Sequence, residues 1–228
     1  MRIKINILAL FFFPLVFCSC EKDPDLEELV ETESEEQNNT NKGDSNGTNS
    51  GTTVSLLNFL GDSIIARWSS VSSYFPEYDC HNYGWSAKGI DTFLGRVNIQ
   101  TLEGTECVVE IGTNDMRRVI DGGDIDNYVE HYIDVLMSLK AKRIYLLSLL
   151  PRNRAKDGGY DYNTHYPEIN KKIENRVAAR MNNVVYIPLF ELFLKDGKMN
   201  PQYSGDGLHP NARGYEVMAK RIREYLVK

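Results

Sequence analysis

The sequence predicts an α/β protein built as a three-layer α/β/α sandwich around a five-stranded parallel sheet. Short apolar runs alternate along the chain with stretches whose apolar residues recur at helical spacing, which is typical of this class. Several apolar runs end abruptly at glycine, as expected where a buried strand meets a tight turn. We expect a flavodoxin-like sheet, in which the first strand lies between the second and the third.

The first strand is predicted to begin at Ser55 and to end at the sequence Gly61-Asp62-Ser63. A helix is expected directly after it, because apolar residues recur on one helical face at Ile64, Ile65, Trp68 and Val71. Further strands are predicted at residues 78–84, 106–111, 143–150 and 184–189. Helices are predicted at residues 89–97, 124–140, 166–181 and 212–225, and a polar loop at 152–163.

The chain begins with a segment that is predicted to lie outside this domain. Residues 1–4 are basic, and the apolar run at 5–17 is short for a membrane span. The sequence around Cys20 resembles a bacterial lipoprotein cleavage site, which implies a signal peptide at 1–20 and a lipidated Cys20. The acidic residues that follow resemble the signal that sends Bacteroidetes lipoproteins to the outer surface. We therefore expect an outer-membrane or cell-surface lipoprotein that contacts the membrane only through its lipid anchor; an ordinary secretory peptide is the alternative.

Residues 21–54 are rich in polar and acidic residues and are predicted to be a disordered tether. This segment contains 10 acidic residues and 2 lysines, a net charge of −8. The domain predicted at 55–228 contains 22 basic and 22 acidic residues, so its net charge is zero. The acidity of the chain belongs to the tether, and no nucleic acid partner is expected.

Two cysteines, Cys80 and Cys107, remain in the predicted domain. In an exported protein they could form a disulfide. Each lies next to or within a predicted strand, and the first strand is expected to lie between those two strands. Two strand spacings are about 9–10 Å, which exceeds the reach of a disulfide. We predict two free, buried thiols.

Ser63 lies in the first turn of a helix that follows a buried strand, where an open α/β sheet binds its ligands. The simpler interpretation is that Ser63 caps that helix. Near the end of the chain, Asp206 precedes His209 by three residues in a loop. That spacing lets the carboxylate orient one ring nitrogen while the other accepts a proton from a serine hydroxyl. The other histidines, His81, His131 and His165, are interpreted as surface or core residues.

Acyl transfer also requires hydrogen-bond donors for the developing oxyanion. Asn114 follows the third predicted strand in the sequence Gly112-Thr113-Asn114-Asp115, so its amide is expected on the same edge of the sheet as Ser63. The stretch 82–89 leaves the second strand on that edge and offers backbone N–H groups. Both stretches are also explained as simple turns. No spacing of histidine, cysteine and acidic residues suggests a metal site.

These four stretches occur in the order and at the strand ends typical of the SGNH hydrolases, or GDSL-type esterases and lipases, which the domain resembles over 55–228. The resemblance implies a cofactor-free serine esterase with Ser63 as nucleophile, His209 as base and Asp206 as its orienting group. The oxyanion hole would be formed by the Ser63 N–H, the Asn114 side chain and one N–H of the second stretch. In the family, a glycine usually supplies the N–H of the second stretch. This sequence has Ala87 at that position, and Gly84 and Gly89 are alternatives.

The four motifs do not fix the substrate. We favour short acyl esters, such as acetyl esters on glycans, because of the predicted surface tether. The alternatives are a lysophospholipase or short-chain lipid esterase, and a non-catalytic surface carbohydrate-binding protein on the same fold. Trp85 and Arg117 are candidate substrate contacts, since an aromatic ring stacks on a sugar and an arginine pairs with an anionic group. Ordinary loop packing and a solvated surface would explain them equally well.

Overall fold

A computed structural model of the chain describes residues 54–226, so the predicted signal peptide, Cys20 and the predicted tether up to residue 53 lie outside the described part. A parallel sheet forms its centre, with strands β1 (Ser55–Gly61), β2 (Tyr78–Asn82), β3 (Glu106–Glu110), β4 (Arg143–Leu147) and β5 (Val184–Ile187). The strand order is β2-β1-β3-β4-β5. Both the five-stranded parallel sheet and the position of β1 between β2 and β3 are therefore confirmed.

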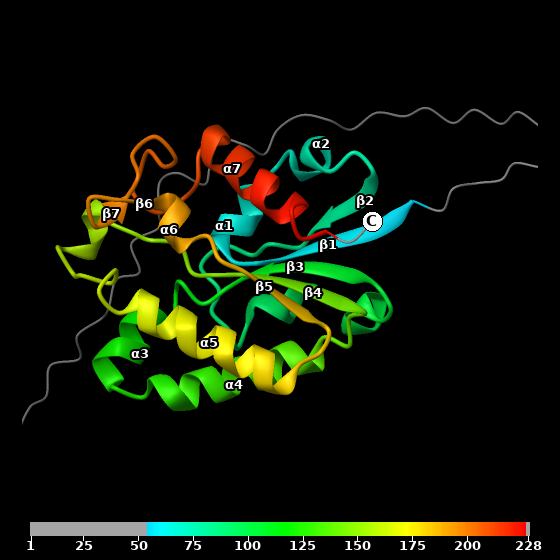
Figure 1. Cartoon of the computed structure of the whole chain (residues 1–228), viewed down its shortest axis with the longest axis horizontal. Helices are drawn as coiled ribbons and strands as arrows, with labels where there is room; N and C mark the ends of the chain where they lie inside the picture. Colours follow the sequence, from blue (N-terminus) through cyan, green and yellow to red (C-terminus); the bar gives the residue numbers. More distant parts are fainter. Residues whose placement is uncertain (1–53, 227–228) are drawn as a thin grey trace, which may run out of the picture. The chain divides into compact units, whose positions relative to one another are not determined.

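Helices cover both faces of the sheet, as the predicted three-layer sandwich requires (Figure 1). One face carries α3 (Met116–Gly122), α4 (Ile125–Ser138) and α5 (Tyr166–Arg180). The other carries α1 (Ser63–Ala66), α2 (Val71–Tyr74), α6 (Phe190–Phe193) and α7 (Ala212–Arg223). A short antiparallel pair, β6 (Leu194–Lys195) and β7 (Lys198–Met199), lies between α6 and α7 along the chain.

Successive side chains of the central strands enter different cores, because side chains alternate between the two faces of a sheet. In β3, Cys107 and Val109 pack with α4 and α5, whereas Val108 packs with the α1 and α7 side. In β4, Ile144 packs with the α4 and α5 side and Tyr145 with the α1 and α7 side. All of these side chains are fully buried, which explains the nearly continuous apolar runs in the sequence.

The helix predicted after β1 is interrupted, which corrects the sequence-based expectation. It forms two short helices, α1 and α2, with Arg67 to Ser70 between them. The amide of Asn82 donates hydrogen bonds to the carbonyls of Ile65 (2.8 Å) and Trp68 (3.0 Å). Those carbonyls would accept from later backbone N–H groups in a continuous helix, so a side chain from the adjacent strand replaces the helical pattern.

The α-helix predicted at 89–97 is wrong. Two 3₁₀ helices occupy this region, η2 (Phe93–Arg96) and η3 (Ile99–Leu102). Ile90 and Phe93 are nevertheless buried, so the apolar spacing predicts the buried side chains correctly but not the type of helix that carries them. Gly95 lies inside η2 against the ring of Trp85, and glycine is a weak helix former. One further 3₁₀ turn, η4 (Ala155–Asp157), lies in the predicted polar loop.

Both cysteines are free, as predicted, but only Cys107 is buried. Cys80 is half-buried because it lies in β2, an edge strand that pairs only with β1. Burial raises the pKa of each thiol to about 11, which disfavours the reactive thiolate. The two thiols are therefore poor nucleophiles.

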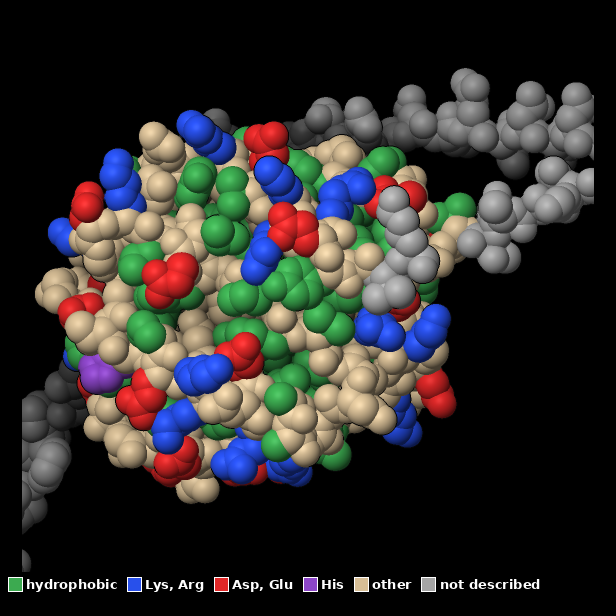
Figure 2. All heavy atoms as spheres, viewed as in Figure 1, with side chains coloured by type: hydrophobic (Ala, Val, Ile, Leu, Met, Phe, Trp, Pro, Cys, Tyr) green, Lys and Arg blue, Asp and Glu red, His purple; other side chains and the backbone are tan. Residues whose placement is uncertain are grey.

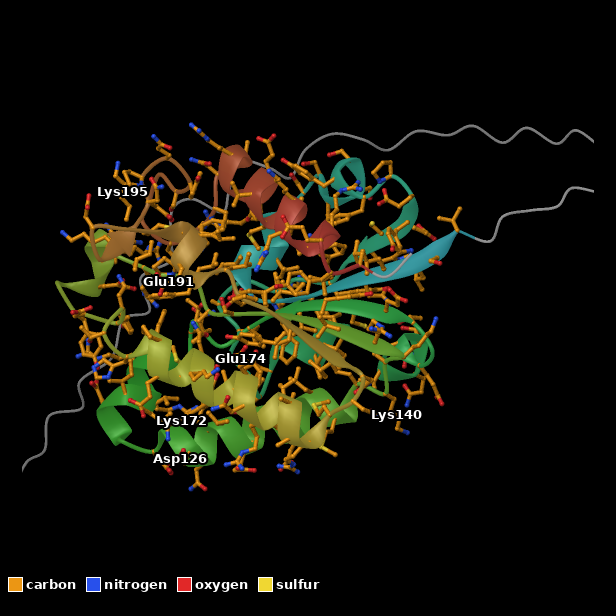
Figure 3. The ribbon with its side chains drawn as sticks, in the orientation of Figure 1. Asp126, Lys140, Lys172, Glu174, Glu191 and Lys195 are labelled. Atoms are coloured by element: carbon orange, nitrogen blue, oxygen red, sulfur yellow. The ribbon has the colours of Figure 1, made fainter. Side chains whose placement is uncertain are left out.

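Charged side chains of both signs are interspersed over α4 and α5 (Figure 2). Several of them join the two helices; Lys172 of α5 lies 2.7 Å from Asp126 of α4, and both are labelled in Figure 3. Arg180 of α5 contacts Glu130 and Asp134 of α4 in the same way. No helix within residues 54–226 combines the length and apolar character that crossing a bilayer requires.

The turn from β1 to α1 depends on Gly61. A Cβ atom at this position would lie 2.0 Å from the Glu110 carbonyl oxygen of β3 and 2.6 Å from the Ile65 side chain. Only glycine lets β1 approach β3 so closely at the point where the chain turns into α1. The position of the following residues, including Ser63, follows from this contact.

We expect Gly61→Ala to lower the free energy of unfolding by about 1–3 kcal/mol, because backbone atoms of β3 would have to move. Gly122→Ala is the matched control, since a Cβ there would meet no atom within 4 Å. That variant should be neutral or stabilised by up to about 1 kcal/mol. Urea unfolding followed by circular dichroism measures both, and equal stability of the two variants would contradict the steric argument.

Candidate functional site

The Ser63 hydroxyl does not cap α1. Asp62, not Ser63, caps the helix, because its Oδ1 accepts a hydrogen bond from the Ile64 N–H (2.9 Å). The capping role that offered the simpler interpretation of Ser63 therefore belongs to its neighbour. Ser63 is half-buried and lies at the carboxyl edge of the sheet, directly after β1.

Ser63, His209 and Asp206 form a continuous chain of hydrogen bonds although 143 residues separate Ser63 from Asp206 (206 − 63). The Oγ of Ser63 lies 2.9 Å from Nε2 of His209, and Nδ1 of His209 lies 2.6 Å from Oδ2 of Asp206. A carboxylate only accepts hydrogen bonds, so Nδ1 carries the proton and Nε2 accepts from the serine. The three side chains are arranged to remove the serine proton.

Backbone contacts fix the loop that carries Asp206 and His209. Oδ1 of Asp206 accepts from the N–H groups of Leu208 (2.9 Å) and His209 (2.8 Å). Gly207 has φ +75 and its carbonyl accepts from the Asn153 N–H (2.8 Å). A Cβ on Gly207 would lie 2.8 Å from the Asn153 carbonyl oxygen, so this loop packs directly on the segment after β4. The histidine is thereby held in place from two sides.

The electrostatics of the pair favour an ionised aspartate and a neutral histidine. Partial burial alone would raise the pKa of Asp206, but hydrogen bonds from His209 and Leu208 outweigh it and hold that pKa well below its usual range. Burial lowers the pKa of His209, and the positive charges of Arg67 and Arg154 lower it further, against the opposite effect of Asp206. A neutral imidazole is the form that accepts a proton.

Ala87 adopts the left-handed conformation with φ +61, one of three non-glycine residues with positive φ among those described. Its N–H has no hydrogen-bond acceptor within the described part of the chain. Gly84, by contrast, already donates its N–H to the side chain of Asn82 (2.9 Å). Gly89 packs against the carboxylate of Asp115, since a Cβ there would lie 2.2 Å from Oδ1. Gly84 is thereby excluded as a free backbone donor, whereas Ala87 and Gly89 both have an N–H without an acceptor among the described residues.

The amide of Asn114 is held by two acceptors. Its Nδ2 donates to Oδ2 of Asp62 (3.2 Å) and to the carbonyl of Lys88 (2.9 Å). These contacts place the amide beside the residue that precedes Ser63 and beside the residue that follows Ala87. An oxyanion at Ser63 would share this amide with Asp62 and Lys88. The predicted grouping of Ser63, Asn114 and the second stretch at one edge of the sheet is observed.

Two buried carboxyl groups, which the sequence analysis missed, lie under this site. Asp62 and Glu110 are both fully buried, and neither carboxyl oxygen of Glu110 has a hydrogen-bond partner within residues 54–226. Burial raises the pKa of both groups. The charge of Asp115 raises the pKa of Asp62 further, against the hydrogen bond from the Ile64 N–H, and the charge of Asp62 raises the pKa of Glu110. Glu110 lies in the predicted third strand and pairs in register with Gly61. The sequence therefore indicates its place in the sheet, but it does not reveal that the carboxyl group has no counter-ion.

The two candidate substrate contacts have partners of their own. The ring of Trp85 lies 4.3 Å from Nζ of Lys88 and 4.6 Å from the guanidinium carbon of Arg96. The backbone N–H of Trp85 donates to the Gly61 carbonyl (2.9 Å). Trp85 thus borders the β1–α1 turn. Arg117 pairs with Asp121 (2.6 Å) and covers the ring of Tyr160 (4.0 Å) on the surface of α3. Its guanidinium is engaged by those two side chains.

Two hollows lie beside the Asp206 loop, and both share Asn153, Arg154 and Ala155. The first encloses about 440 Å³ and extends toward Tyr160 and Lys198. The second encloses about 460 Å³ and is bordered by Lys156 and Asp206. The lining of the first hollow is mostly polar and charged, which suits a hydrated substrate, whereas the second hollow is partly apolar through Met199 and Pro201. Within the described residues, no group of three or more histidine, cysteine or acidic side chains is arranged to hold a metal ion.

A model of the GDSL-like Lipase/Acylhydrolase family matches residues 59–217, a segment that includes every residue of the site. The chain belongs to this family. It is accordingly a hydrolase that acts on ester bonds, as the resemblance of the four motifs implied. A comparison with curated proteins gave no significant match.

Solved structures show the same fold at low sequence identity. A protein provisionally described as a platelet activating factor from Streptococcus pneumonia is 22% identical, with a TM-score of 0.65 over 77% of this chain and 86% of that one. A GDSL-like lipase from Bacteroides thetaiotaomicron is 22% identical, with a TM-score of 0.58 over 74% and 86%. Axe2, an acetylxylan esterase from Geobacillus stearothermophilus, is 16% identical, with a TM-score of 0.54 over 77% and 97%.

We expect Ala87→Gly to leave the free energy of unfolding unchanged or to raise it by up to about 1 kcal/mol. The left-handed conformation costs alanine about 1–2 kcal/mol, which exceeds the extra entropy that glycine loses on folding. Ala178→Gly on the exposed side of α5 is the matched control and should cost up to about 1 kcal/mol. Chemical denaturation compares the two variants; equal losses at both positions would contradict the strain at Ala87.

Proposed function

We propose that this member of the family is a serine esterase in which Ser63 is the nucleophile, His209 the general base and Asp206 the group that orients His209. The observation that carries this proposal is the unbroken path of 2.9 Å and 2.6 Å from the serine oxygen through the imidazole to the carboxylate. Nucleophile, base and orienting group are the three parts that activate a serine in acyl transfer.

The reaction proceeds in two steps. As Oγ of Ser63 attacks the ester carbonyl, its proton passes to Nε2 of His209 and then to the departing alcohol, so the ester C–O bond breaks and an acyl-serine forms. His209 next takes a proton from water, the hydroxide attacks the acyl-serine, and Ser63 regains the proton when the acid leaves. The negative charge of Asp206 stabilises the imidazolium present in both steps.

Three donors would stabilise the oxyanion: the N–H of Ser63, the N–H of Ala87 and the side-chain amide of Asn114. The unpaired N–H of Ala87 supports its assignment in place of Gly84, whose N–H is engaged by Asn82. The Asn114 amide already points toward the β1–α1 turn through its bond to Asp62. Losing one such donor commonly costs about 10²–10³ in kcat.

The substrate that we propose is a short acyl ester, such as an acetyl group, on a glycan. The polar and charged lining of the first hollow supports a carbohydrate rather than a long acyl chain. The fold shared with Axe2, an acetylxylan esterase, is consistent with this choice. We also propose that Cys20 carries a lipid anchor and that residues 21–54 hold the enzyme away from an outer-membrane or cell surface. A surface position would give the site access to extracellular glycans.

We expect the purified protein to hydrolyse 4-nitrophenyl acetate faster than the butyrate and octanoate esters. Ser63→Ala should lower kcat by about 10⁴-fold or more, because it removes the nucleophile. Ser69→Ala is the matched control, since Ser69 is exposed and lies six residues away in the chain (69 − 63). Equal turnover by wild type and Ser63→Ala, or none by either, would overturn the serine mechanism.

The pH dependence of kcat/KM follows from His209. Its pKa is lowered from an ordinary value of 6.5, so the active neutral form prevails above a pKa that lies below 6.5. Activity on a neutral ester should therefore rise with pH through a midpoint below 6.5 and then level off. Initial rates in buffers of constant ionic strength test this; a midpoint clearly above 6.5 would contradict the electrostatics of the site.

A further inference from the structure

Two arginines beside the catalytic groups have no counter-ion. Arg67 follows α1 directly, and its backbone N–H donates to the carbonyl of Ser63 (3.1 Å). Residues four apart on a helical turn lie on the same side, so the Arg67 side chain emerges next to Ser63. It is exposed and forms no ion pair or hydrogen bond within the described residues.

Arg154 belongs to the segment that packs against the loop of the histidine. It follows Asn153, whose N–H bonds to the carbonyl of Gly207 in the Asp206–His209 loop (2.8 Å). Its own backbone nitrogen would lie 3.2 Å from a Cβ on Gly207. Arg154 lines both hollows, and Lys156 lines the second. Neither of these two cations has an ion pair with a described residue.

Other arginines of this region are neutralised. Arg152 forms a largely buried ion pair with Asp157, and Arg117 pairs with Asp121. Arg118 lies 3.7 Å from Asp115. Arg67, Arg154, Lys156 and Lys198 are therefore cations of this region without an ion pair to a described residue.

Of the nearby acidic groups, Asp206 is engaged by His209 and Asp157 by Arg152, and burial raises the pKa of Asp62 and Glu110. Asp161 lines the first hollow with Arg154 and accepts from the backbone N–H groups of Asn163 and Thr164, but it has no ion pair with a described residue. The two arginines disfavour the imidazolium that forms as Ser63 loses its proton. A substrate that brings a negative charge between them would remove this penalty.

We propose that the substrate is an ester on a sugar that bears a carboxylate, and that Arg67 and Arg154 bind this carboxylate beside the scissile ester. The proposal rests on the serine esterase function above and narrows its substrate class to acidic glycans. A planar guanidinium matches the two oxygens of a carboxylate, which a neutral acetylated sugar does not offer. The same contact neutralises the arginines and makes His209 a stronger base.

The test compares two forms of one probe, partially O-acetylated oligogalacturonide and the same material with its carboxylates converted to amides. We expect kcat/KM for acetate release to be at least about tenfold higher for the acidic form, which corresponds to about 1.4 kcal/mol. This preference should decrease as salt is added, because exposed charges are screened. A preference below twofold at low salt would overturn the proposal.

Variants assign the preference to the two arginines. Arg67→Gln and Arg154→Gln should each lower the ratio of acidic to amide kcat/KM about tenfold, and this ratio is insensitive to a general loss of activity. Arg143→Gln is the matched control, because Arg143 begins β4 at the opposite edge of the sheet and has no ion pair among the described residues. An unchanged ratio in both site variants would overturn the proposal.

A binding measurement keeps this test independent of catalysis. In Ser63→Ala, the acidic oligosaccharide should raise the pKa of His209 measured by NMR, whereas the amide form should not; no change with the acidic form would overturn the proposal. Absence of Ser63-dependent turnover alongside that rise would count against the esterase function alone. Faster hydrolysis of a short-chain phosphatidylglycerol than of the acidic oligosaccharide would assign the arginines to a lipid headgroup and overturn the glycan assignment.

Discussion

The close approach of β1 to β3 at Gly61 is the contact on which the site depends. No Cβ fits between Gly61 and the Glu110 carbonyl, so this close contact requires glycine. The chain leaves the sheet directly after it and enters α1 at Ser63. Asp62 caps this helix by accepting from the Ile64 N–H, so the Ser63 hydroxyl is not used as the cap and contacts His209 instead. The same Asp62 holds Asn114 through its second oxygen. One turn thus positions both the proposed nucleophile and a proposed oxyanion donor.

Three carboxyl groups near Ser63 differ in charge because their surroundings differ. Asp206 accepts several hydrogen bonds at the surface, which stabilises its anion. Asp62 and Glu110 are fully buried, which favours the protonated form of the pair. Such a separation of pKa values by environment is typical of catalytic sites. The imidazole therefore faces one strong anion, Asp206, and its direction is fixed.

Much of the fold and site could be predicted from the sequence, for identifiable reasons. The strands follow from buried apolar runs, and the Asp206–His209 pair from local spacing that needs no tertiary knowledge. The interruption between α1 and α2 could not be predicted, because it depends on the Asn82 amide from another strand. The α-helix predicted at 89–97 was wrong for a similar reason, because Gly95 packs against the ring of Trp85, a contact that the local sequence does not reveal.

The positions of Arg67 and Arg154 show why residue type alone does not identify a binding residue. Arg117 and Arg152 are arginines of the same region, yet Asp121 and Asp157 neutralise them. Only the contacts distinguish a guanidinium that stabilises the fold from one that remains available to a ligand.

Charge, more than enclosure, distinguishes the surroundings of Ser63. Of the two hollows next to the site, only the second is bordered by Asp206, and neither lining includes Ser63 or His209. The arginines act over longer distances and alter the basicity of His209 itself. Recognition and proton transfer are thereby coupled: a ligand that satisfies Arg67 and Arg154 also restores the histidine's affinity for the serine proton.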